Sequence, residues 1–279
     1  MDSFGSIIKK IRKQQHLTQK MLSEDICSQG VLSRIENGEE LPNIMVMQRL
    51  CQRLGVTMDQ IMSSKSLDFY LVPQVFEQIA IFFRHKCYQQ LINYMEESEL
   101  VHYIYLDTDW QWYYYYLGNC EYFLTNNYVQ AIDYLKKSLS YTYHVHKIHV
   151  SDAELQVISC LGNIYSHSGN QELAKHYFDL SIQYFNKWPN ERIDTDLTLI
   201  FYHYATFLVR NNQDYEQANR YIDQGIDWAL KKSSYYFLGE LLLLKSKVMQ
   251  EFQLEEQTHY YQTLAEQICH METLMSQPL

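Results

Sequence analysis

The segment that decides the fold is Leu17–Gly38, LTQKMLSEDICSQGVLSRIENG. Thr18 is a typical N-cap, and it predicts a helix that runs through residues 21–26. A second helix is expected over 29–36, because Asn37-Gly38 is a helix-ending signal. The apolar residues spaced to lock the two helices together are Leu22, Ile26, Leu32 and Ile35.

The outward face of the second helix is polar at its N-terminal end. Its side chains, with the residue just before the helix, are Ser28, Gln29, Gly30, Ser33 and Arg34. A DNA-recognition helix needs a polar face at this end, because the end enters the major groove. The segment therefore predicts a helix-turn-helix that reads duplex DNA.

The flanks of this segment complete a small helical domain of five short helices over residues 1–63. A helix over 3–14 has Phe4, Ile8 and Ile11 on one face. Pro42-Asn43 opens a helix that ends at Gly55, and Thr57 caps a last one over 58–63. The polar stretch 63–67 is the expected linker. We expect a DNA-binding domain over 1–65 and a second domain over 66–279.

The second domain contains a repeating pattern. Five similar four-residue blocks recur at steps of 40, 43, 44 and 40 residues, and each is followed three residues later by an aromatic residue. The blocks begin at Tyr88, Tyr128, Gln171, Tyr215 and Glu255. Ahead of two blocks lie Leu117-Gly118-Asn119 and Leu161-Gly162-Asn163. A small residue lets paired helices cross closely, and the pattern looks like a degenerate tetratricopeptide repeat. It predicts an all-α chain whose second domain is a right-handed solenoid of about five repeats, with a concave face made mostly by the first helices.

Charge is divided unevenly between the two expected domains. Residues 1–65 carry 9 Lys/Arg and 7 Asp/Glu, a net of +2, while residues 66–279 carry 14 and 26, a net of −12. This division suggests that only the first domain approaches a polyanion. The six cysteines form no CxxC pair, so we expect reduced thiols and a cytoplasmic protein without a membrane partner.

Other classes of function find little support in the sequence. There is no nucleotide-binding loop, GxSxG motif or HExxH motif, so we expect no enzyme and no cofactor. His144, His146 and His149 lie close together, but no cysteine or carboxylate flanks them at ligand spacing. We therefore expect no metal site.

The helix-turn-helix resembles that of phage-repressor-type regulators, on the run from Thr18-Gln19 to Ser33-Arg34-Ile35-Glu36-Asn37-Gly38. The resemblance implies that Gln19 bonds a DNA phosphate and that Gln29 reaches an adenine edge. Arg34 would contact a guanine or a phosphate. It also implies a structural pair between Arg12 and Glu36. Candidates for phosphate contacts, with a solvated face as the alternative, are Lys9, Lys10, Lys13 and Lys20.

The whole chain resembles the RRNPP group of peptide-pheromone-responsive regulators of Gram-positive bacteria, of the PlcR and Rgg-like type. The resemblance rests on the run from Glu24 to Glu36 and on the repeat cores at Asn163-Ile-Tyr165 and Tyr215-Glu-Gln-Ala218. It implies a homodimer that binds operator DNA and is switched by a short imported signalling peptide in the concave groove.

Amide side chains suit an extended peptide, because they pair with backbone donors and acceptors at once. Asn119 and Asn163 occupy equivalent positions 44 residues apart. The resemblance matches Asn163 to a groove asparagine and places His203 where the next would stand. Aromatic candidates for apolar pockets, each with core packing as the alternative, are Tyr122, Tyr165, Tyr202 and Phe207.

Two alternatives remain open at this point. In one, the repeats of a helix-turn-helix repressor bind a protein partner rather than a peptide. In the other, the chain is a repeat scaffold whose N-terminal module has lost its function.

Overall fold

The computed structural model describes residues 4–56, 58, 61, 67–104, 106–187 and 197–275. These residues form helices joined by short loops, and no β-strand occurs among them. The all-α class is therefore confirmed. The predicted helix over 58–63, the linker over 63–67 and the boundary at 65/66 fall almost entirely outside the described residues.

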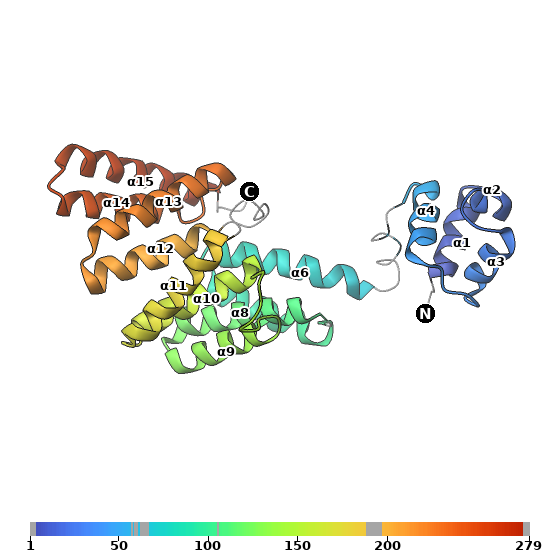
Figure 1. Cartoon of the computed structure of the whole chain (residues 1–279), viewed down its shortest axis with the longest axis horizontal. Helices are drawn as coiled ribbons and strands as arrows, with labels where there is room; N and C mark the ends of the chain where they lie inside the picture. The colour runs from blue at the N-terminus through green and yellow to red at the C-terminus, as the bar shows by residue number, and fades with distance from the viewer. Residues whose placement is uncertain are drawn as a thin grey trace. The chain divides into compact units, whose positions relative to one another are not determined.

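The N-terminal helices pack around one apolar core. They are α1 (Phe4–Gln14), α2 (Gln19–Ser23), α3 (Gln29–Asn37) and α4 (Ile44–Leu54) (Figure 1). The most deeply buried side chains of the core are Ile8, Leu22, Leu32, Ile35, Leu50 and Leu54. Of the residues predicted to lock the two helices together, Leu22, Leu32 and Ile35 are buried in this core, and Ile26 is partly buried against it.

The ends of these helices follow the local signals. Thr18, Ser28 and Asn43 each accept a hydrogen bond from the backbone N–H three residues later. Gly38 and Gly55 end α3 and α4 in the left-handed conformation, with φ of 76° and 68°. One detail differs from the prediction. Helix α2 ends at Ser23, and residues 24–26 form a turn in which Asp25 has a φ of 57°.

Helices α1 and α3 cross very closely at Gly5. A Cβ atom on Gly5 would lie 1.7 Å from the carbonyl oxygen of Ile35. No larger residue fits at this crossing without separating the helices. This contact fixes the C-terminal end of α3 against α1.

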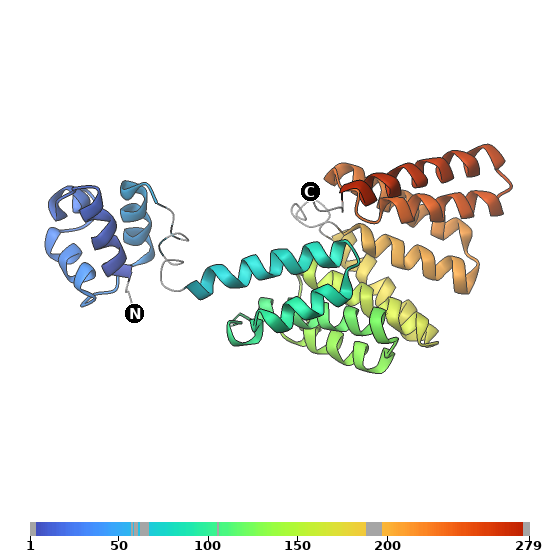
Figure 2. The ribbon, with the colours of Figure 1, turned by 180° about the vertical axis from the view of Figure 1, so that it is seen from behind.

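The remaining helices form successive antiparallel pairs, which Figures 1 and 2 show from opposite sides. The first helices of the pairs are α6 (Leu67–Arg84), α8 (Asp107–Thr125), α10 (Asp152–His167), α12 (Thr198–Phe207) and α14 (Leu238–Glu251). The second helices are α7 (Tyr88–Glu97), α9 (Tyr128–Ser140), α11 (Gln171–Lys187), α13 (Tyr215–Lys232) and α15 (Glu255–Met275). A 3₁₀ turn, η1 (Leu100–His102), precedes α8, and a π-helical turn, η2 (Leu208–Asn212), extends α12.

The repeat pattern of the sequence is confirmed by these bounds. All five blocks that it aligned stand at the first residue of a second helix. Neighbouring pairs also pack on one another, through α9 with α10, α11 with α12, and α13 with α14. This nearest-neighbour stacking is typical of a repeat solenoid.

The chain divides into two compact units. One comprises residues 1–78 with 98–103, and the other comprises residues 79–97 with 104–279. The division therefore falls inside α6 rather than at its start. The unit that contains residues 104–279 is called the repeat unit below.

Glycines allow the close helix crossings inside the repeat unit. A Cβ atom on Gly118 would lie 2.8 Å from Cγ of Leu135, and one on Gly162 would lie 2.9 Å from the ring of Phe178. The Phe178 ring is itself fully buried and stacks on Tyr204, with ring centroids 5.2 Å apart. It has no free space into which it could retreat.

Gly162→Ala is therefore expected to destabilise the repeat unit by about 1–3 kcal/mol, the usual cost of overpacking a core. Gly30→Ala is the matched control, because a Cβ atom on Gly30 meets nothing closer than 3.9 Å. That change should stabilise its own helix slightly, by about 0.5–1 kcal/mol. Thermal unfolding followed by circular dichroism would measure both. A neutral Gly162→Ala would contradict the close crossing.

Candidate functional site

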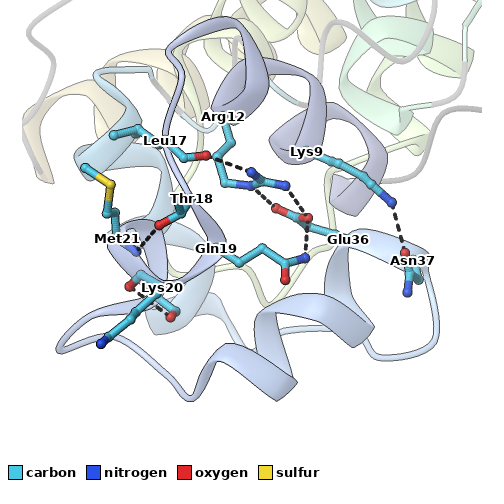
Figure 3. A network of polar contacts seen from close by, with 10 residues as sticks. Lys9, Arg12, Leu17, Thr18, Gln19, Lys20, Met21, Glu36 and Asn37 are labelled. Atoms are coloured by element: carbon cyan, nitrogen blue, oxygen red, sulfur yellow. Dashed lines mark hydrogen bonds and ion pairs between the residues drawn. The ribbon is translucent and has the colours of Figure 1, made fainter.

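A network of polar contacts joins α1, α2 and α3 (Figure 3). Arg12 donates from Nε to Oε1 of Glu36 at 2.6 Å and from Nη2 to Oε2 at 2.9 Å. Its Nη1 donates to the carbonyl oxygen of Leu17 at 2.7 Å. The two charged residues are only 8% and 3% exposed. The pair that the phage-repressor resemblance implied is thus present, and it is buried and bidentate.

Glu36 is held as a carboxylate in this network. Burial alone would raise the pKa of Glu36. The hydrogen bonds from Arg12 and Gln19 lower it by more than burial raises it, so the pKa lies below its ordinary value. Gln19 contributes through Nε2, which donates to Oε2 of Glu36 at 2.8 Å. The amide nitrogen of Gln19 is therefore engaged within the protein, although the sequence analysis expected this side chain to bond a DNA phosphate.

The N-terminal end of α3 presents the predicted polar face. Gln29 and Gly30 are exposed, and Ser33 is half-buried. Ser28 is exposed, and its hydroxyl accepts the N–H of Val31 as the helix cap. Arg34 is exposed and donates from Nε to Glu40 at 2.8 Å.

The Gln29 amide is the group on α3 best placed to read a base edge, since it is exposed at the N-terminus of the helix. The Arg34–Glu40 pair is open to solvent, with side chains 51% and 38% exposed, so it contributes little stability and can exchange for a phosphate.

The basic residues of α1 and α2 differ in their surroundings. Lys10, Lys13 and Lys20 are exposed. Lys9 is half-buried, and its Nζ donates to Oδ1 of Asn37 at 3.0 Å, at the end of α3 (Figure 3).

A second candidate site is a small cavity inside the repeat unit, with a volume of about 20 Å³. Its walls are mostly aromatic, with one basic, one imidazole and one amide side chain among them. The lining residues are Phe83, Lys86, Tyr88, Asn119, Phe123, Leu199, His203, Tyr236 and Phe237.

The cavity is closed on one side by a contact between the first and last helix pairs. Lys86, in the turn after α6, forms an ion pair with Glu240 in the first turn of α14. The Lys86 ammonium also lies 5.5 Å from the ring centroid of Phe237. Repeats normally contact only their neighbours, so this contact between residues 154 positions apart is unusual for a solenoid.

Two of the predicted peptide-binding residues line this cavity. His203 is 7% exposed, and its Nδ1 lies 3.1 Å from Oγ of Ser159. Burial lowers the pKa of His203 to about 3, with the nearby His167 adding to the shift, so the imidazole is neutral. Asn119 is 4% exposed and donates from Nδ2 to the carbonyl oxygen of Tyr115 at 2.8 Å.

The other predicted peptide-binding residues lie outside the cavity walls. Asn163 and Tyr122 are half-buried on α10 and α8, and the ring of Tyr122 contacts the cavity residue Phe123. Tyr202 is half-buried and contacts Phe237, with ring centroids 5.1 Å apart.

Tyr165 and Phe207 instead pack between helices. The Tyr165 ring stacks on Tyr177 at 5.5 Å, and Phe207 contacts the ring of Phe178 at 5.2 Å. They are only 8% and 3% exposed. For these two, the structure shows the core-packing alternative.

Sequence reasoning missed most of the cavity wall. Phe83, Lys86 and Tyr88 belong to the corner between α6 and α7, and Tyr236 and Phe237 precede α14. Tyr88 begins the first of the repeat blocks, but no motif in the sequence marks the other four residues. His167 and Arg210, which contact each other, were also missed. The 44-residue spacing between Asn119 and Asn163 could have pointed to Arg210, because Arg210 lies two such spacings after Tyr122.

Neither metal-binding clusters nor membrane-spanning helices were found within the described ranges. No three His, Cys, Asp or Glu side chains gather there as ligands would. None of the described helices combines the length and the apolar character needed to cross a membrane.

The fold and the two sites define a helix-turn-helix protein with a C-terminal array of helical repeats. Residues 8–61 match the helix-turn-helix family HTH_3. A comparison with the curated protein sequences finds no match.

Solved structures share the fold over nearly the whole chain. One is Bacillus thuringiensis PlcR in complex with the peptide PapR7 and DNA, which is 22% identical with a TM-score of 0.72 over 99% of this chain and 100% of that one. The apo form of PlcR is 21% identical, with a TM-score of 0.63 over all of both chains. ComR from S. thermophilus, in complex with DNA and its signalling peptide ComS, is 16% identical with a TM-score of 0.64, over 97% of this chain and 94% of that one.

Proposed function

We propose that this chain is a cytoplasmic transcriptional regulator that binds operator DNA as a homodimer and is switched by a short signalling peptide bound in its repeat unit. The observation that carries the proposal is the N-terminal face of α3. Gln29 and Arg34 are exposed on this face. The buried Arg12–Glu36 pair and the close crossing at Gly5 fix α3 against α1.

DNA recognition would combine the two kinds of contact that such helices use. Gln29 would pair with the N6 and N7 atoms of an adenine in the major groove. Phosphate contacts would come from Arg34 and from the exposed Lys10, Lys13 and Lys20. Gln19, which bonds Glu36, would act by fixing α2 on α3 and would present its backbone N–H at the start of α2 to a phosphate.

Peptide recognition would use the cavity and the helix faces beside it. Asn119, Asn163 and the neutral His203 would bond the peptide backbone, and an apolar side chain would pack against the aromatic residues around the cavity. Of the two proteins that share the fold, PlcR is described in complex with the peptide PapR7 and DNA, and ComR in complex with DNA and its signalling peptide. That description supports the same two partners here.

Gln29→Ala and Arg34→Ala are expected to weaken DNA binding in different ways. Duplexes selected from a random library with the wild-type chain would serve as the probe, and fluorescence anisotropy would give the Kd. Loss of the Gln29 pair should cost about 1–3 kcal/mol and relax preference at one base pair. If Arg34 contacts a phosphate, its removal should weaken all sequences alike and lower the salt dependence by about one charge.

Arg220→Ala is the matched control for Arg34→Ala, because Arg220 is also exposed but lies on α13 in the repeat unit. It should leave the Kd unchanged. Recovery of no sequence-specific duplex by the wild-type chain, with or without added peptide, would contradict the proposed function. A stoichiometric protein partner, with no peptide retained, would favour the alternative in which the repeats bind a protein.

A further inference from the structure

Arg210 has an unusual setting in the repeat unit. It stands on η2, the π-helical turn that follows α12, and its side chain is exposed. Within the described part of the chain it forms no ion pair with a carboxylate. Its Nη1 instead lies 2.8 Å from Nε2 of His167. Single π-helical turns are rare and occur frequently at functional sites.

The contact with Arg210 fixes the state of His167. A guanidinium can only donate, so Nε2 of His167 accepts and carries no proton. Nδ1 therefore carries the proton and donates to the carbonyl oxygen of Asn163, at 2.9 Å. The imidazole is neutral, and it serves as a support that orients Arg210 without neutralising its charge.

Other donors surround the same point. The hydroxyl of Tyr122 lies 3.1 Å from Nδ1 of His167. Asn211 donates from Nδ2 to Oγ of Ser166 at 3.3 Å, which ties η2 to α10. Tyr122, Ser166 and Arg210 are spaced 44 residues apart, so three successive first helices contribute at one level of the array.

The electrostatic surroundings favour an anion. Burial lowers the pKa of His167, and the charge of Arg210 lowers it further. Burial raises the pKa of Tyr122, and Arg210 and Asn163 act against that rise. No carboxylate is among the main causes of either pKa shift. A positive site is notable in a segment, residues 66–279, whose net charge is −12.

We infer that Arg210, oriented by His167 and flanked by Tyr122, binds a carboxylate of the ligand that occupies the repeat unit. The inference rests on the proposed function, and it specifies one chemical group of the peptide. A planar guanidinium that lacks an acidic partner suits bidentate contact with a carboxylate. The carboxylate belongs either to the C-terminus of the peptide or to an Asp or Glu side chain.

Three pools of synthetic heptapeptides distinguish these sources. The first has free C-termini and no Asp or Glu, the second has amidated C-termini and includes Asp and Glu, and the third is amidated and lacks both. Each pool is incubated with the full chain, and retained peptides are counted by size exclusion and mass spectrometry. The variants are Arg210→Gln and, as an exposed control on α13, Arg220→Gln.

The wild-type chain is expected to retain peptides from the first or second pool and few from the third. Arg210→Gln should reduce their retention by about 10- to 100-fold, the usual effect of losing a charge-assisted bond. Arg220→Gln should have no effect. If the wild-type chain retained as much peptide from the third pool as from the first two, and Arg210→Gln did not change this, the inference would be overturned. The proposal that the chain binds a peptide would still stand. Retention from no pool would overturn both.

A second measurement needs no ligand. Removal of the Arg210 charge in Arg210→Gln should raise the pKa of His167, as followed by the histidine ring signals in an NMR titration. An unchanged titration would show that Arg210 does not face His167, and would overturn the proposed orientation. The circular dichroism spectrum of the variant should match that of the wild type, because both groups are exposed.

Discussion

Glu36→Ala is expected to cost about 3–5 kcal/mol of the free energy of unfolding of the DNA-binding helices, because it leaves a buried guanidinium without its partner. Arg12 is 8% exposed, and it loses both of its bonds to the carboxylate. Gln19 loses its acceptor as well. A small domain has only about 5–15 kcal/mol in total, so DNA binding should fail with the fold.

Hydrogen exchange over residues 4–56 is the suitable measurement, since the sequence has no Tyr or Trp before Tyr70 to report on these helices. The exchange rate of the most protected amides should rise by at least about 100- to 1000-fold. Glu40→Ala is the matched control, because it removes the carboxylate of the exposed Arg34–Glu40 pair. Its cost should stay below about 1 kcal/mol.

Replacing both partners gives a further comparison. Arg12→Leu combined with Glu36→Leu should recover much of the stability lost by Glu36→Ala, because no charge is then left buried. Protection that stays as low in the double variant as in Glu36→Ala would argue that shape, rather than charge pairing, holds α1 against α3.

The repeat unit is expected to lose about 2 kcal/mol of stability between pH 7.5 and pH 5, through His203. Burial lowers the pKa of this imidazole from 6.5 to about 3 in the folded chain. Below pH 6.5 the unfolded chain therefore binds a proton that the folded chain does not. The free energy of unfolding then falls as the pH is lowered, and the loss continues until the pH approaches 3.

Glu36 and Glu154 are expected to contribute little in this window, whereas Asp109, whose pKa is raised by burial, changes the stability in the direction opposite to His203. The pKa values of Glu36 and Glu154 are lowered from 4.5, so the stability they supply is present above 4.5 and is lost only as the pH falls through their folded values. His167 adds a change in the same direction as His203, because burial lowers its pKa as well.

Tryptophan fluorescence in urea isolates the repeat unit, since all four Trp residues lie after residue 104. His203→Gln is the test variant, and the comparison is between slopes against pH rather than absolute stabilities. The slope should flatten in His203→Gln and persist in His149→Gln, an exposed histidine. Equal slopes in all three chains would mean that His203 is accessible to protons in the folded state.

The sequence by itself determined the helical class and most of the helix ends, although not the end of α2 at Ser23. Thr18, Ser28, Asn43 and the glycines at 38 and 55 act through bonds within four residues, so their effect is readable without a fold. The repeat register was readable for the same reason, since each block begins a helix.

Only the tertiary structure decided which polar groups meet. Gln19 was expected to face DNA, yet it bonds Glu36, 17 residues away. Lys86 meets Glu240 across 154 residues, and His167 meets Arg210 across 43. Such pairs depend on how far each repeat rotates against the next and on which side chains fill the space between them. Burial then sets the charge, as at His203, so the chemistry of the cavity follows from packing over long sequence separations.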